Sequence, residues 1–140
     1  MDLSSVYQEI ILKHYRGSRF RGELEDPDVV VPLNNPTCGD DIVLQMKLEG
    51  GRVAEIRFSG NGCAISQASA SMMSEQVVGK SLEEMQALAA RFRAMLHGDE
   101  AAARAPELGD LRALAGVARL PRRVKCALLA WEALEAGLRA

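Results

Sequence analysis

Cys38 and Asp40 place a thiol and a carboxylate two positions apart in the segment NNPTCGDDIVLQMKL, residues 34–48. A thiolate is both a nucleophile and a metal ligand, and a carboxylate can bind the same ion. Apolar residues at 42, 44 and 46 alternate with other residues, as in a half-buried strand, and they share parity with Cys38 and Asp40. If the strand extends back to Cys38, both groups face the core, where an unpaired carboxylate is prohibitively costly. Alternatively, the strand begins at Asp41 and Asp40 caps a turn.

Cys63 follows Gly60-Asn61-Gly62 and opens a predicted helix. The unpaired N–H groups and the dipole at a helix start stabilise a thiolate. The predicted strands 42–48 and 53–59 are joined by a Gly-Gly turn at 50–51 and form an antiparallel hairpin. Cys38 precedes the first strand and Cys63 follows the second. Antiparallel pairing therefore brings the two cysteines to one edge of the sheet.

Cys126 lies in the first turns of the last predicted helix, after Arg122, Arg123 and Lys125. Three cations near one sulfur favour its ionised form, although on their own they are more typical of a solvated helix face. With Asp40, the three cysteines make a four-ligand set suited to Zn²⁺. An iron–sulfur cluster is the alternative, although its ligands are usually all cysteines. Lys125 and the arginines would offset the net negative charge of a zinc site. The plainest alternative is that the cysteines are buried and inert.

The whole chain sets limits on this chemistry. Its 140 residues predict one domain, 1–140, and 48% hydrophobic with 26% charged residues is typical of a globular protein. A net charge of −2 argues against nucleic acid or an anionic membrane as a partner. No apolar run approaches the roughly 20 residues of a membrane span, and the N-terminus lacks the features of a signal peptide. We therefore expect a cytoplasmic protein with reduced cysteines.

The remaining patterns predict an α+β fold, with a small antiparallel sheet of about three strands packed against several helices. Val29–Val31 is the predicted edge strand, within an otherwise irregular stretch from 17 to 37. Ser81 and Glu84 form a capping box for one helix. His14 and His97 each end a predicted helix and are not counted as ligands. The predicted helices span residues 3–16, 63–78, 82–96, 107–115 and 121–138.

Four segments carry a family resemblance: NNPTCGD (34–40), GNGCAISQASASMM (60–73), LGDLRALAGV (108–117) and LPRRVKCALLAWEALEAG (120–137). They closely resemble the SufU branch of the IscU/NifU-N-terminal family of iron–sulfur cluster assembly proteins. The resemblance implies a SufE/NifU-like fold and a metal site of three cysteines and one aspartate. Those positions are Cys38, Asp40, Cys63 and Cys126 here.

Three features distinguish the branches of this family. The IscU type carries histidine before the third cysteine, where this chain has Lys125, and a Leu-Pro-Pro-Val-Lys chaperone segment, which reads Leu-Pro-Arg-Arg-Val-Lys here. The stretch from roughly 95 to 111 has no counterpart in the IscU type. These features favour the SufU branch.

The resemblance implies a zinc-dependent sulfur acceptor. Such a protein takes persulfide sulfur from a PLP-dependent cysteine desulfurase and passes it to downstream iron–sulfur acceptor or scaffold proteins, with Cys38 as the accepting residue. The alternative function is a scaffold on which a [2Fe–2S] cluster is assembled from iron and transferred to apo-proteins. A third interpretation is that zinc is purely structural.

Overall fold

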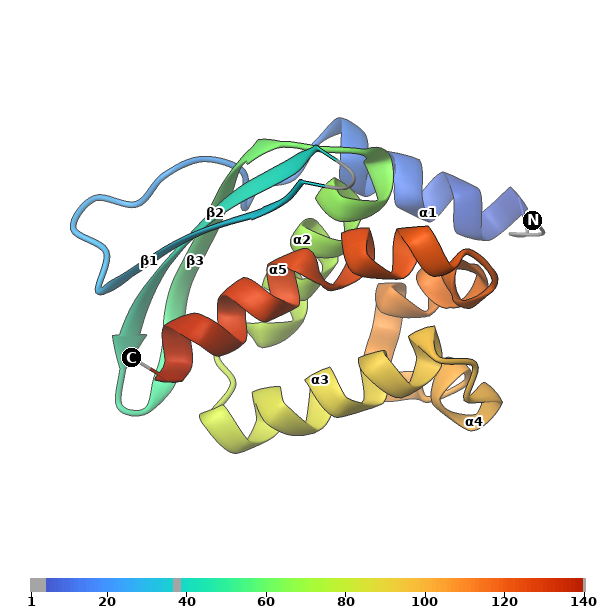
Figure 1. Cartoon of the computed structure of the whole chain (residues 1–140). Coiled ribbons are helices and arrows are strands. Elements are labelled where there is room, and N and C mark those ends of the chain that lie inside the picture. Colours follow the sequence, from blue (N-terminus) through green and yellow to red (C-terminus); the bar gives the residue numbers. More distant parts are fainter. Residues whose placement is uncertain (1–4, 37–38, 140) are drawn as a thin grey trace.

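Residues 40–49 form the central strand of the sheet, and their even-numbered side chains through Met46 are buried. The computed structural model describes residues 5–36 and 39–139, and it has the predicted α+β architecture (Figure 1). The elements in chain order are α1 (Ser5–Arg16), β1 (Val29–Asn35), β2 (Asp40–Glu49), β3 (Arg52–Asn61), α2 (Ala64–Val77), α3 (Leu82–Leu96), α4 (Glu100–Ala103), the 3₁₀ segment η1 (Pro106–Arg119) and α5 (Pro121–Arg139).

The three strands form an antiparallel sheet in the order β1-β2-β3. The predicted hairpin is confirmed: Leu44 pairs with Phe58, and the register shifts once, between Lys47 and Leu48. β1 runs from Val29 to Asn35 and is longer than the predicted Val29–Val31. Its pairing places Asn35 opposite Asp40, so the start of β2 lies inside the sheet rather than in a free loop.

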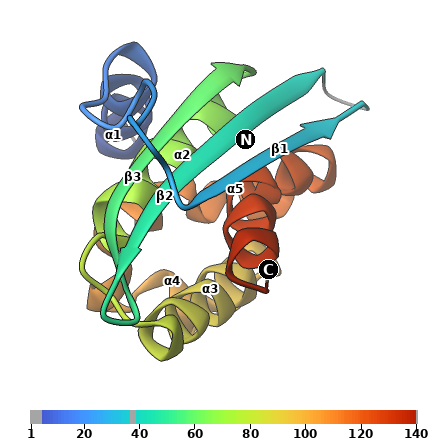
Figure 2. The same ribbon diagram turned by 90° about the vertical axis from the view of Figure 1, so that its left-hand side faces the viewer.

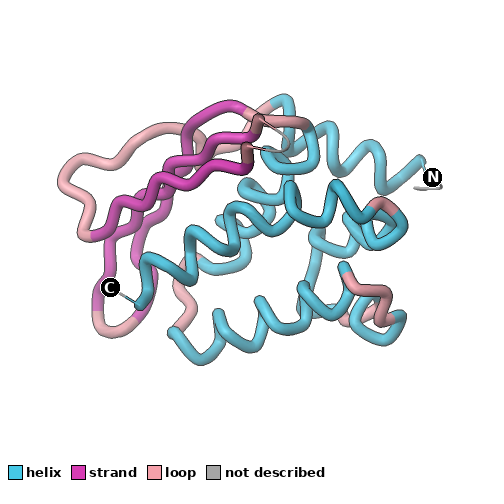
Figure 3. The backbone as a smooth tube through the Cα atoms, in the orientation of Figure 1, coloured by secondary structure: helices cyan, strands magenta, loops and turns pink. Residues whose placement is uncertain are grey.

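The helices cover one face of this sheet (Figures 2 and 3). α5 packs against β1 and β2, α2 packs against β3, and α1 packs on α2. The ring of Trp131 on α5 stacks on Phe92 of α3, with centroids 4.9 Å apart. These contacts place the first turns of α2 and α5 near the end of the sheet where β2 begins.

The stretch after α3 differs from the prediction. The predicted helix at 107–115 is instead a 3₁₀ segment, η1, that contains a break at Gly109, whose φ is +53°. A left-handed backbone interrupts a helix, and glycine adopts it without a steric penalty. The short helix α4 was not predicted, and the Asp99 side chain caps it by accepting a hydrogen bond from the N–H of Ala102.

The predicted capping box is confirmed. The Ser81 hydroxyl accepts from the N–H of Glu84, whose carboxylate accepts from the N–H of Ser81, which completes the capping box of α3. Among the described residues, no helix combines the length and apolar character needed to cross a membrane.

Candidate metal centre

Asp40 is the first residue of β2, and its side chain is only 1% exposed. Ile42, two positions further on, is fully buried on the same face. The strand therefore includes Asp40, and the alternative in which it begins at Asp41 is wrong. A carboxylate buried this deeply needs hydrogen bonds or a cation to offset its lost hydration.

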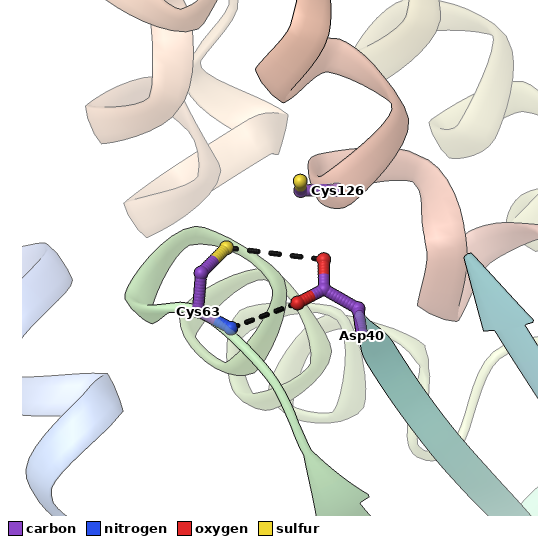
Figure 4. Close-up of side chains that lie close together, drawn as sticks. All are labelled: Asp40, Cys63 and Cys126. Atoms are coloured by element: carbon purple, nitrogen blue, oxygen red, sulfur yellow. Dashed lines mark hydrogen bonds between the residues drawn. The ribbon is translucent and has the colours of Figure 1, made fainter. Parts of the chain in front are cut away.

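Cys63 supplies one of those hydrogen bonds. Its backbone N–H donates to Oδ1 of Asp40 at 2.9 Å, and its Sγ lies 3.9 Å from Oδ2 (Figure 4). Cys63 is the N-cap of α2, with an extended backbone at φ −70° and ψ 169°. The predicted location at a helix start is confirmed. Thiol and carboxylate meet because β3 ends beside the start of β2.

The close approach of Asp40 to Cys63 requires glycine at position 62. A Cβ at this position would lie 2.8 Å from Oδ1 of Asp40 and would also overlap Oγ of Ser66. The hydroxyl of Ser66 donates to the carbonyl of Cys63 at 3.1 Å. A larger residue at 62 would therefore displace both the Asp40 carboxylate and the Ser66 hydroxyl.

Cys126 enters from α5 and is fully buried. Its Sγ lies 3.9 Å from the carbonyl oxygen of Arg122, one helical turn earlier. The hydroxyl of Ser69 on α2 donates to the carbonyl of Ala127 at 2.6 Å. This bond fixes the helix that carries Cys126 against the helix that carries Cys63.

One ligand atom each from Asp40, Cys63 and Cys126 lies within 4.8 Å of the other two. Two sulfurs and one carboxylate oxygen, converging from three elements, are donors that Zn²⁺ accepts. Their chemistry and spacing fit a zinc ion or a thiolate-bound iron centre. The structure thus brings together three of the four predicted ligands. Cys38 lies outside the described residues, and its assignment stays a prediction.

Arg123 is a cation that interacts with two of these ligands, Cys63 and Cys126. Its pKa is raised, first by a hydrogen bond to the Cys126 side chain and then by the charges of Cys63 and Cys126. Arg123 precedes Cys126 by three positions and so shares its helix face. Lys125, which was predicted to balance the charge together with the two arginines, is exposed on α5, and its role stays a prediction.

His14 was interpreted from the sequence as an ordinary helix-terminal residue, yet it is only 2% exposed. Its Nδ1 lies 2.7 Å from Oγ of Ser71 on α2, and its Nε2 lies 2.9 Å from Oδ2 of Asp110 in η1. Sequence reasoning missed this network because its partners are 57 and 96 positions away. The network ties α1 to the helix that presents Cys63.

With this geometry established, comparison with known proteins identifies the family. Residues 6–140 match the family model described as the NifU-like N terminal domain. The chain belongs to this family. The resemblance seen in the sequence motifs is therefore confirmed, and so is the fold class.

Individual relatives of the NifU-like family agree with this assignment. The chain is 45% identical to the protein of Bacillus subtilis named zinc-dependent sulfurtransferase SufU, over 98% of this chain and 92% of the relative. It is 44% identical to the iron–sulfur cluster assembly scaffold protein IscU of Streptococcus pyogenes, over 98% and 85% of the two chains. The crystal structure of the FiSufU protein of Fervidobacterium islandicum is 34% identical and superposes with a TM-score of 0.85, covering 93% of this chain and 94% of that one.

Proposed function

We propose that this protein acts in iron–sulfur cluster biogenesis as a zinc-dependent sulfur acceptor. The observation that carries the proposal is the convergence of Asp40, Cys63 and Cys126 at one buried point. The 45% identity to a relative named zinc-dependent sulfurtransferase SufU supports the choice of zinc and of sulfur transfer. The donor partner would be a PLP-dependent cysteine desulfurase. We further propose that residues 1–140 act as one domain, in the cytoplasm.

Asp40, Cys63 and Cys126 would hold the zinc ion together with Cys38, and a bound ion would keep the thiols ionised and hold their elements together. Arg123 offsets the negative charge that the sulfurs bring to the site, because its guanidinium interacts with both cysteines. The N–H of Cys63 fixes one oxygen of Asp40, so the carboxylate keeps its orientation.

Cys38 would accept the sulfur. Its thiolate attacks the outer sulfur of the persulfide on the desulfurase, and a new S–S bond forms on Cys38. The S–S bond of the donor breaks, and its electron pair stays on the desulfurase cysteine as a thiolate. The exchange needs no external oxidant, because one persulfide replaces another.

The test is to incubate the protein with a cysteine desulfurase and cysteine, and then to locate the added sulfur by mass spectrometry of intact protein and peptides. We expect one added sulfur atom on Cys38, and neither sulfur uptake nor stimulation of the desulfurase by Cys38→Ser. Cys38→Ser that still stimulates turnover would exclude this residue as the acceptor.

The second candidate function is a scaffold for a [2Fe–2S] cluster, and the 44% identity to a relative named IscU scaffold protein favours it. Here iron and sulfide are the cargo of the site. Anaerobic reconstitution with iron, cysteine and the desulfurase distinguishes the two functions. A cluster that moves intact to an apo-protein faster than free iron and sulfide can rebuild it would favour the scaffold.

A further inference from the structure

A polar cleft of about 310 Å³ lies beside the metal centre, where the end of α1 meets the junction of β3 and α2. Its walls include Arg16, Arg21, Gly62 and Gln67, and none of its lining residues is acidic. Gly62 immediately precedes Cys63 in the chain. The cleft is therefore continuous with the wall of the metal centre, although none of the predicted ligands lines it.

Arg21 is held in a fixed position at this cleft. Its Nη1 donates to Oε1 of Gln67 at 2.6 Å, and its Nη2 donates to the carbonyl oxygen of Tyr15 at 3.1 Å. The guanidinium also lies over the ring of Phe58, 5.1 Å from the centroid. These hydrogen bonds use two of the five N–H donors of the side chain, and the ring contact orients its plane. A guanidinium ordered in advance loses less entropy when it binds an anion.

Gln67 contains an unpaired donor in the same place. The side chain is 2% exposed, and its Nε2 has no hydrogen-bond partner among the described residues. The amide orientation follows from Arg21, because a guanidinium only donates and so requires the amide oxygen to face it. The NH₂ group is left without an acceptor, which costs free energy in a buried position. This nitrogen is closed to solvent, so an acceptor oxygen in the cleft reaches it only when the amide turns toward the cleft.

The charges indicate what kind of ligand fits. Arg16 and Arg21 contribute two positive charges, while the C-terminal end of α1, at Arg16, contributes roughly half a negative charge. The N-cap of α2, Cys63, makes no side-chain hydrogen bond to the first turn, so the positive end of that helix adds to the field. A planar anion with a single charge and two oxygens matches a guanidinium fork.

We propose that this cleft binds one carboxylate group next to the metal centre, on the N–H donors of Arg21 that Gln67 and Tyr15 do not occupy. The carboxylate comes either from a small free acid or from an acidic side chain of a protein that docks at Cys63. Carboxylate binding does not depend on the proposed function, and only the second source refers to the desulfurase.

The first experiment is an NMR titration of the ¹⁵N-labelled zinc-loaded protein with sodium acetate, against sodium chloride at equal ionic strength. We expect saturable shifts of the Arg21 Nε–H and Gln67 Nε2–H₂ resonances with acetate and at least threefold smaller shifts with chloride. Shifts that stay linear, or that chloride reproduces, would overturn the proposal.

Matched variants exclude a general charge effect. Arg21→Gln should weaken acetate binding at least tenfold. Arg19→Gln should change it less than twofold, because Arg19 is also exposed and lies over a phenylalanine, Phe20, yet does not line the cleft. Gln67→Met keeps the volume and removes the amide, so it should also weaken binding. Equal losses in the Arg19 and Arg21 variants would contradict the assignment.

The second experiment identifies the source of the carboxylate. Binding of a cysteine desulfurase to wild type is measured by calorimetry in acetate and in chloride at equal ionic strength. Acetate that lowers the affinity at least threefold more than chloride, in wild type but not in Arg21→Gln, assigns the site to an acidic side chain of the partner. No difference between the salts assigns it to a free acid. If no desulfurase binds at all, the proposed function fails while the acetate titration still decides the cleft.

Discussion

The backbone N–H of Cys63 and Oδ1 of Asp40 form a 2.9 Å hydrogen bond between residues 23 positions apart. The other oxygen of the same Asp40 side chain approaches Sγ of Cys63, so the carboxylate and the sulfur lie side by side. Four groups of variants test this arrangement and other features of the fold.

Asp40→Ala should impair both metal binding and stability. It removes a ligand and leaves the N–H of Cys63 without its acceptor, at a cost of about 1–3 kcal/mol in the unfolding free energy. We expect the zinc dissociation constant, measured by chelator competition, to rise at least tenfold. Asp41→Ala is the matched control, because Asp41 is exposed, and its effect on unfolding should stay below about 0.5 kcal/mol. Asp40→Ala that lowers stability but leaves sulfur transfer unchanged would indicate a purely structural zinc.

Arg123→Gln should weaken zinc binding more than Lys125→Gln. Arg123 interacts with both sulfurs, which raise its pKa, and it shares a helix face with Cys126, whereas the adjacent Lys125 does not. Supporting groups around metal ligands typically change affinity by about 10- to 100-fold, and we expect about tenfold for Arg123→Gln at low salt. The measurement is zinc competition at two ionic strengths. An equal effect of the two variants would restore Lys125 as the charge-balancing residue.

Glu84 should titrate below the ordinary glutamate value. Its pKa is lowered from 4.5, mainly by the backbone N–H of Ser81 and then by the Ser81 side chain, with Arg52 contributing less. A lowered folded pKa means that the stabilisation is present above about pH 4.5 and is lost as the pH falls through the folded value. Side-chain ¹³C NMR titration should show this shift. Ser81→Ala removes the hydroxyl but keeps the backbone N–H, so it should move the pKa only part of the way back toward 4.5, and a complete return would contradict the backbone N–H as the main cause.

Gly137→Ala should destabilise the protein, whereas Gly17→Ala should not. A Cβ at 137 would lie 2.9 Å from Cγ1 of Val29 and 3.0 Å from Cε of Met46, so α5 would be pushed away from the sheet. The resulting overpacking should cost roughly 1–3 kcal/mol of stability, which exceeds the gain of about 1 kcal/mol from the higher helix propensity of alanine. At Gly17 a Cβ meets nothing within 4 Å, and its φ is not positive, so alanine should be neutral or stabilising by up to about 1 kcal/mol. Urea denaturation measures both, and a more stable Gly137→Ala would show that α5 adjusts without cost.

The sequence was informative where the pattern is local. Alternation through Ile42 and Met46 predicted the face of β2, and strand parity alone placed Asp40 on the buried side. Arg123 could also have been singled out, because a residue three positions before Cys126 shares its helix face, whereas the adjacent Lys125 does not.

Long-range features could not be predicted in the same way. His14 gave no sign that it would be buried against Ser71 and Asp110, because those partners are far along the chain and no periodicity links them. The amide nitrogen of Gln67 is unpaired because Arg21 binds the amide oxygen, and Arg21 lies in an irregular stretch. A glutamine within the run of small residues that forms α2 was the available signal, since that helix is buried from Ser66 to Ser74.

The hydrogen bond from Ser69 to Ala127 has a further consequence for how the protein would lose a bound metal ion. Because α2 and α5 are fastened together beside the sulfurs, neither helix can detach without separating Cys63 from Cys126. Separation of these two helices, which is a partial opening of the fold, would thus release a bound ion before the whole protein unfolds. Molecules in which α2 and α5 have separated would lose their metal. The metal content per molecule would therefore measure the intact fraction of a preparation.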